Sequence, residues 1–193
     1  EEFEALELPP YAERGAVTDE YIEVFRKVWS APTVSHAGKY VNFRNVSVLP
    51  NPVQKPGVPI WTGGESAPAL RRAVRVGDGW YPIGNNPRFP MDTHARIAGR
   101  LDRLKGIADE EGRDLATLDL AYWSHWYNLG EEVRNKDGDR MILTGSADAI
   151  ANDIGEMKQQ GFGNLMLNFT TGSAGETTDR MAAFMADVAP RVA

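Results

Sequence analysis

The sequence of 193 residues contains no cysteine. Disulfide bonds, thiolate nucleophiles and cysteine metal ligands are therefore excluded. The sequence also has no run of about 18 apolar residues, the length that a membrane helix needs. Its first residues lack both the basic region and the apolar core of a signal peptide. We therefore expect a cytoplasmic protein that makes no contact with a membrane.

Basic residues are too few and too scattered to form a surface for polyanions. The chain has 21 basic and 27 acidic residues and a net charge of -6, so we expect no nucleic-acid partner. The histidines His36, His94 and His125 lie far apart and lack the spacing of metal ligands, so we expect no metal. His125, in a predicted strand, is more typical of a hydrogen-bonded core residue than of a proton shuttle.

Apolar residues are spaced in a pattern that predicts a leading helix and then four strand-to-helix units. In the leading helix, which is predicted to begin near Thr18, we expect Tyr21, Val24, Phe25 and Val28 to face the core. Strands are expected at residues 59–62, 79–83, 118–126 and 164–169, each followed by an amphipathic helix.

Strands that alternate with amphipathic helices predict a parallel sheet of the α/β class with right-handed crossovers. Four units fit an open flavodoxin-like sheet, or half of a (β/α)8 barrel of about 250 residues. A hairpin insertion predicted between residues 34 and 59 is unusual in a small open sheet, and the sequence starts abruptly without Met. We therefore expect residues 1–193 to form a single domain, the C-terminal half of a TIM-type barrel whose N-terminal strands are absent.

The turn after the first predicted strand is the most informative stretch for function. Gly63 and Gly64 let the backbone turn sharply, and Ser66 can cap the helix that follows. The free amides of the first helical turn form a natural anion site, where Ser66 would help to hold a phosphate and Arg71 or Arg72 could add charge. The alternative is an ordinary strand-to-helix turn with a good cap, because such turns are common.

Several motifs follow one another in a distinctive order. They are GKY at residues 38–40, PVQKP at 52–56, IWTGG at 60–64, ALRRA at 69–73 and GDGW at 77–80. In order and spacing this series resembles the luciferase-like monooxygenase family, and within it the branch described as F420-dependent. The likeness is close as far as Pro82, and beyond that residue it extends only to the layout.

The resemblance implies a (β/α)8 barrel that binds coenzyme F420, or FMN as the alternative, with the cofactor phosphate at Gly63, Gly64, Glu65 and Ser66. Trp80, in the next predicted strand, is a further candidate because it could line the barrel mouth. The catalytic residues stay unknown, since the family often supplies them from the first barrel strands, which have no counterpart here. The remaining tryptophans are expected to fill the core; they are Trp29, Trp61, Trp123 and Trp126.

We therefore expect a flavin- or F420-dependent oxidoreductase, monooxygenase-like, that transfers hydride or activates oxygen at the bound ring. Its partners would be a small-molecule substrate and further copies of itself in a homo-oligomer. Two alternatives stay open: a non-catalytic flavin-binding or pairing protein, and an inactive barrel fragment with exposed strand edges. The loop at residues 84–88 follows a strand where barrel active sites lie, so Arg88 is a candidate for substrate contact, although the loop equally fits simple turn chemistry.

Overall fold

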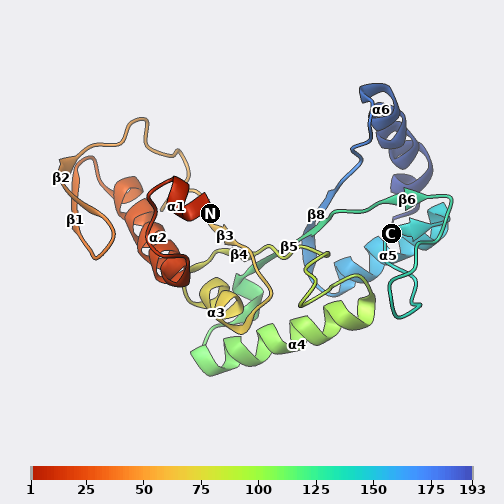
Figure 1. Ribbon diagram of the computed structural model, residues 1–193, viewed down its shortest axis with the longest axis horizontal. Coiled ribbons are helices and arrows are strands. Elements are labelled where there is room, and N and C mark those ends of the chain that lie inside the picture. Colours follow the sequence, from red (N-terminus) through yellow and green to blue (C-terminus); the bar gives the residue numbers. More distant parts are fainter. Residues whose placement is uncertain (1, 193) are drawn as a thin grey trace.

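A computed structural model describes residues 2–192 as a parallel sheet with helices along one face, and places further helical segments at both ends (Figure 1). The first half contains α1 (Glu2–Ala5), η1 (Tyr11–Glu13), α2 (Arg14–Ser30), β1 (Val34–Ala37), β2 (Asn42–Val46), β3 (Trp61–Thr62), α3 (Ala67–Val76), β4 (Gly79–Trp80) and α4 (His94–Glu111). The second half contains η2 (Leu115–Thr117), β5 (Asp119–Ser124), β6 (Asn128–Leu129), β7 (Thr144–Gly145), α5 (Ala147–Gln159), β8 (Phe162–Leu167), α6 (Ala174–Ala183), η3 (Phe184–Val188) and η4 (Ala189–Arg191).

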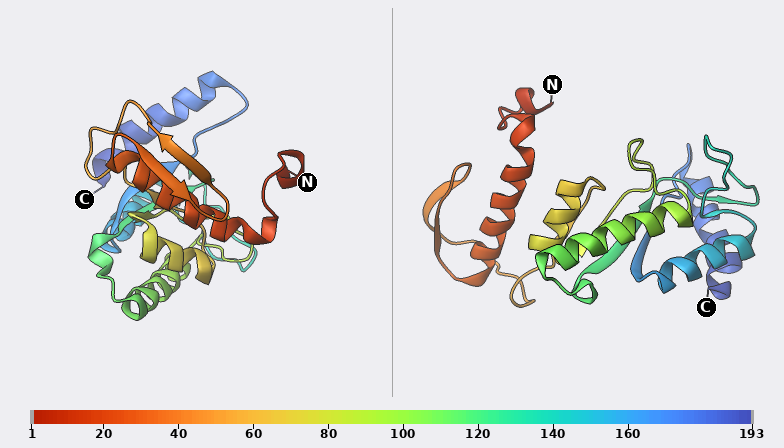
Figure 2. Two further views of the ribbon diagram at one scale, coloured as in Figure 1. Left: turned by 90° about the vertical axis from the view of Figure 1, so that its left-hand side faces the viewer. Right: turned by 90° about the horizontal axis from the view of Figure 1, so that it is seen from below.

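The main sheet has the strand order β3-β4-β5-β8, and every neighbouring pair is parallel. Helices α3, α4 and α5 lie along one face of it (Figure 2). The sheet does not close on itself, so β3 and β8 form its two edges. This arrangement confirms the predicted α/β class and the partial barrel of four strand-to-helix units. A short parallel pair, β6 with β7, was not predicted.

Helix α3 turns its apolar side toward the sheet as predicted. Leu70, Ala73 and Val74 are all buried there. In α4 the predicted Leu104 is fully buried, and the helix ends at Glu111, just before the C-cap residue Gly112. The positive φ of 68° at Gly112 is a conformation that glycine adopts readily. The core between the helices and the sheet is thus built from residues that repeat at helical spacing.

The predicted hairpin insertion is present, with β1 antiparallel to β2. Glu20 of α2 holds it, because its carboxylate accepts hydrogen bonds from the backbone N–H groups of Lys39, Tyr40 and Val41 at 2.7 to 3.1 Å. One carboxylate therefore satisfies the donors at the tip of the hairpin and attaches the insertion to the helix.

The leading helix differs from the prediction. It begins at Arg14 rather than near Thr18, and of the expected core residues Tyr21 and Phe25 are 39% and 45% exposed. Val28 is buried as predicted, Val24 is partly buried, and Ile22 is buried in place of Tyr21. Helix α2 packs on α3 and β1, and these elements cover only one side of it.

Of the four tryptophans expected in the core, Trp126 is partly buried and packs against it. For the other three the prediction is wrong, because Trp29 and Trp61 are partly buried outside the core cluster and Trp123 is 37% exposed. The rings of Trp61 and Trp123 form a row with Tyr81 and His125, with centroids 6.2 Å apart for Trp61–Tyr81, 6.3 Å for Tyr81–Trp123 and 4.2 Å for Trp123–His125. Alternate strand residues point to opposite faces, and the described helices cover only one face of this sheet.

None of the helices described at residues 2–192 has the length and apolar character needed to cross a membrane.

Candidate anion-binding turn

The turn from β3 to α3 has the geometry expected of an anion site. Gly64 has a φ of 98°, which a residue with a side chain rarely adopts. Ser66 occupies the N-cap position in an extended conformation, but its side chain makes no capping hydrogen bond. The prediction that Ser66 caps the helix is therefore wrong, and its hydroxyl is left available for another partner. Pro68 in the first helical turn removes one of the amides that a cap would otherwise bind.

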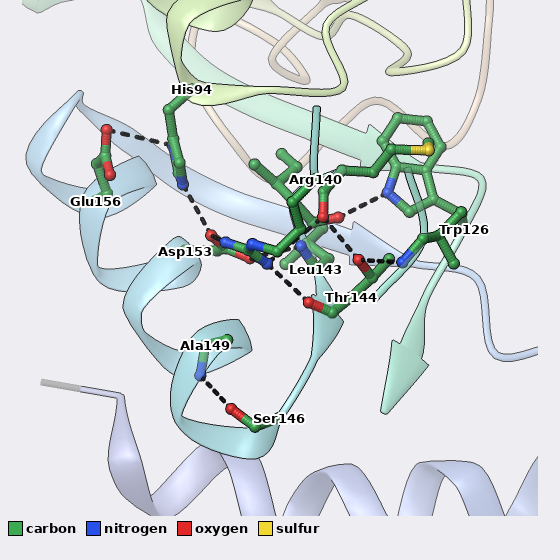
Figure 3. Close-up of polar contacts among 12 residues, drawn as sticks. His94, Trp126, Arg140, Leu143, Thr144, Ser146, Ala149, Asp153 and Glu156 are labelled. Carbon is green, nitrogen blue, oxygen red and sulfur yellow. Dashed lines mark hydrogen bonds and ion pairs between the residues drawn. The ribbon is translucent and has the colours of Figure 1, made fainter. Parts of the chain in front are cut away.

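A second turn, from β7 to α5, shows how the same motif looks when it serves only the helix (Figure 3). Gly145 has a φ of 108°, and Ser146 Oγ accepts a hydrogen bond from the N–H of Ala149 at 3.1 Å. Thr93 and Ser173 cap α4 and α6 in the same way. Ser146, Thr93 and Ser173 each accept a capping hydrogen bond with the side chain, whereas Ser66 does not.

Thr62 adds a further polar group at the same place. Thr62 is only 7% exposed, and its Oγ1 atom is buried with no hydrogen-bond partner among the described residues. A buried hydroxyl without a partner is costly, so it favours a ligand that supplies one. Sequence reasoning did not single out Thr62, although its position at the end of the strand, just before the two glycines, was visible.

Thr62, Gly64 and Ser66 line a common cavity of about 850 Å³ between α2 and the turn. Two cationic side chains, Arg14 and Arg72, also line it, and no Asp or Glu is among the lining residues. Arg72 is tied to Asp19 of α2 by an ion pair of 2.5 Å. The residues around the cavity thus combine a helix N-terminus, hydroxyl groups without a partner and positive charge, which suits an anion such as phosphate.

The structure separates the two arginines that were candidates for the site. Arg71 forms ion pairs with Glu110 and Glu111 at the end of α4 and does not line the cavity. Arg72 is the one that reaches it. Arg88 is exposed on the loop after β4 and does not line this cavity.

Glu65 and Trp80 support the turn from behind. The Glu65 carboxylate is almost fully buried, at 1% exposure, and accepts hydrogen bonds from Ile83 N at 2.8 Å and from Asn86 Nδ2. Trp80 does not line an open mouth as expected; it is fully buried, and its Nε1 donates to Gly64 O at 3.0 Å. Direct contact of Glu65 with a cofactor stays a prediction. Trp80 instead stabilises the turn through its hydrogen bond to Gly64.

A second polar cluster lies behind the β7–α5 turn (Figure 3). The buried Asp153 accepts hydrogen bonds from His94 Nε2 at 3.0 Å, from Arg140 and from Leu143 N at 2.7 Å. Burial alone would raise the pKa of Asp153, but His94 and Arg140 outweigh it and lower that pKa. Each charged side chain in this cluster lies beside one of opposite charge, so we assign the cluster a structural role. No group of His, Asp or Glu side chains at residues 2–192 has the arrangement of a metal site.

A parallel half-barrel with a glycine turn and a helix N-terminus at the carboxyl end of a strand defines the α/β fold class of this chain. Residues 1–127 match the luciferase-like monooxygenase family, and the chain belongs to it. Uncharacterized proteins of Mycobacterium tuberculosis and Mycobacterium bovis are 33% identical over 105 residues, which is 54% of this chain and 34% of theirs. The chain thus spans about a third of the length of these curated relatives.

Solved structures share the fold over nearly the whole chain. An F420-dependent secondary alcohol dehydrogenase has a TM-score of 0.68 and 17% identity, covering 96% of this chain and 64% of its own. The monooxygenase RslO1 of Streptomyces bottropensis has a TM-score of 0.72 and 21% identity, covering 100% of this chain and 65% of its own. At these identities the likeness shows the fold alone.

Proposed function

We propose that this chain binds the phosphate of a flavin-type cofactor at the β3–α3 turn and acts in an oxidoreductase or monooxygenase of the luciferase-like family. The observation that carries the proposal is the free hydroxyl of Ser66 beside the buried, unpartnered Oγ1 of Thr62, in two residues that line one cavity with Arg14 and Arg72. Coenzyme F420 is the cofactor that we favour, with FMN as the alternative, because the motifs between residues 38 and 80 resemble those of the F420-dependent branch.

The residues of the turn fit such a group. A Cβ atom on Gly64 would lie 2.8 Å from Ala69 Cβ, so the backbone can come close to the helix only with glycine there. The amides that begin α3, together with the hydroxyls of Thr62 and Ser66, would hold the phosphate, and Arg72 would neutralise part of its charge. When bound, the ring would supply the hydride or activate oxygen, and the chain would contribute binding and orientation.

Titration of the purified chain with F420, FMN and inorganic phosphate, followed by cofactor fluorescence and calorimetry, tests the proposal. Ser66→Ala should weaken binding by about 1 to 2 kcal/mol, roughly 5- to 30-fold, because a charge-assisted hydrogen bond is lost. Thr62→Val, which keeps the shape of the side chain, should have an effect in the same range.

The matched control is Ser146→Ala in the second turn. This change removes a helix cap and should lower stability by about 1 kcal/mol without altering cofactor affinity. Tight binding of one cofactor by the wild type and weaker binding by both turn variants would support the assignment. Equal affinity for all variants would contradict it, as would a wild type that binds none of the three compounds.

A further inference from the structure

Glu65 occupies an unusual place beside the anion-binding turn. Glu65 is not among the residues that line the cavity, and its carboxylate is hydrogen-bonded to the loop at residues 83–91, which follows β4. Both of its acceptor oxygens are used there, one by the backbone N–H of Ile83 at 2.8 Å and the other by the side-chain amide of Asn86. A buried carboxylate thus connects two segments at the carboxyl end of the sheet.

The orientation of the Asn86 amide is fixed by its own loop. Asn86 Oδ1 accepts hydrogen bonds from the backbone N–H groups of Arg88 at 3.0 Å and Phe89 at 3.3 Å. The NH₂ group must therefore face Glu65. Two donors converge on Glu65, and a carboxylate can accept from both, whereas a glutamine could accept from only one and would place its own donor against the other.

Arg100 of α4 reinforces the same connection. Its Nη1 donates to the backbone oxygen of Glu65 at 3.2 Å, and its guanidinium lies 4.6 Å from the centre of the Phe89 ring. The loop is closed by Met91 N donating to Gly84 O at 3.0 Å, and Gly84 N donates to Trp123 O of β5 at 2.9 Å. Turn, loop and sheet therefore form one hydrogen-bonded unit.

We propose that Glu65 is a positioning residue that couples the anion-binding turn to the loop at residues 83–91. Glu65 directly precedes Ser66 in the chain, so an anion that orders the turn also orders the loop through the Glu65 carboxylate. The loop carries the exposed Asn85 and Arg88 at the face where barrel active sites lie. This inference rests on the proposed function, because the ligand that orders the turn is its phosphate-bearing cofactor.

Amide hydrogen exchange of the full chain, measured with and without F420 and FMN, tests the coupling. In the wild type, the cofactor that binds should slow exchange at residues 83–91. Glu65→Gln should speed exchange of the Ile83 amide about three- to tenfold in the free protein and should abolish the cofactor-dependent slowing. Asn86→Ala, at a partly exposed position, breaks the same connection from the loop side and should act in the same direction.

Ser66→Ala serves as the control, because it should weaken cofactor binding and leave loop exchange in the free protein unchanged. Exchange in α4 and β5 should stay at the wild-type level in Glu65→Gln, which separates loss of positioning from unfolding. Unchanged loop exchange in free Glu65→Gln and Asn86→Ala would overturn the positioning role. A wild type that binds no cofactor would instead overturn the proposed function and, with it, the coupling. In that case loop exchange in the free Glu65→Gln and Asn86→Ala variants would still differ from that of the wild type, which distinguishes this failure from the first.

Discussion

At the scale of single residues, Gly64 is the position where the turn tolerates least change. Its φ of 98° is unfavourable for any residue with a Cβ atom, and that atom would lie 2.8 Å from Ala69 Cβ. We expect Gly64→Ala to lower the free energy of unfolding by about 1 to 3 kcal/mol, measured by urea denaturation, and to weaken cofactor binding. Gly99→Ala in α4 is the control, since nothing lies within 4 Å of a Cβ there.

Because alanine favours a helix over glycine by roughly 1 kcal/mol, Gly99→Ala should raise the free energy of unfolding. A Gly64→Ala protein as stable as the wild type would contradict the geometry of the turn. The sequence alone predicted this glycine turn, because glycine pairs after an apolar strand have a known conformational use. It did not predict the free hydroxyl of Ser66 or the orientation of Glu65, since both depend on what the neighbouring loop and helix supply.

At the scale of elements, the hairpin of β1 and β2 depends on the ionised Glu20. Burial alone would raise the pKa of Glu20, but the N–H groups of Val41 and Tyr40 outweigh it and lower that pKa below the ordinary value of 4.5. A lowered pKa means that Glu20 stabilises the folded hairpin above the pKa of the unfolded chain. This contribution is lost as the pH falls through the lower, folded pKa.

The backbone amide proton shifts of Lys39, Tyr40 and Val41 should therefore titrate together below pH 4.5 in NMR spectra. Glu20→Gln should abolish this shared titration and loosen the hairpin at neutral pH. Glu23→Gln is the control, because its carboxylate pairs with Lys27 within the same helix at 2.7 Å. Amide shifts that titrate unchanged in Glu20→Gln would show that another group holds the hairpin.

The sequence predicted the order and type of the helices and strands more completely than it predicted which side chains are buried. Helical spacing located α3, α4 and α5 because each of these helices packs on the sheet and needs one apolar side. The same reasoning failed for Phe25 and Trp123, since an apolar residue is buried only where another element covers it. Spacing identifies a face of a helix or strand, and the contacts of the whole fold decide whether that face is covered.

At the scale of the whole molecule, the chain is elongated, with α2 and its hairpin at one end and α6 at the other (Figure 1). Both edges of the main sheet, β3 and β8, lack a neighbouring strand among residues 2–192. Beside β8 lies an apolar groove of about 360 Å³ lined by Leu165, Leu167 and Phe169 among others. Open strand edges next to apolar surface promote pairing between chains.

We therefore propose that the purified chain self-associates through the open edge at β8, with a mass in sedimentation equilibrium that rises with concentration above the 21.3 kDa of one chain. Met166→Lys places a charge on the edge strand β8, opposite Trp123 in the register, and should weaken association by about tenfold. Met185→Lys is the control, because Met185 is already 64% exposed in η3, outside the sheet, and should leave association unchanged. A single species of 21.3 kDa at every concentration would show that the open edges do not pair.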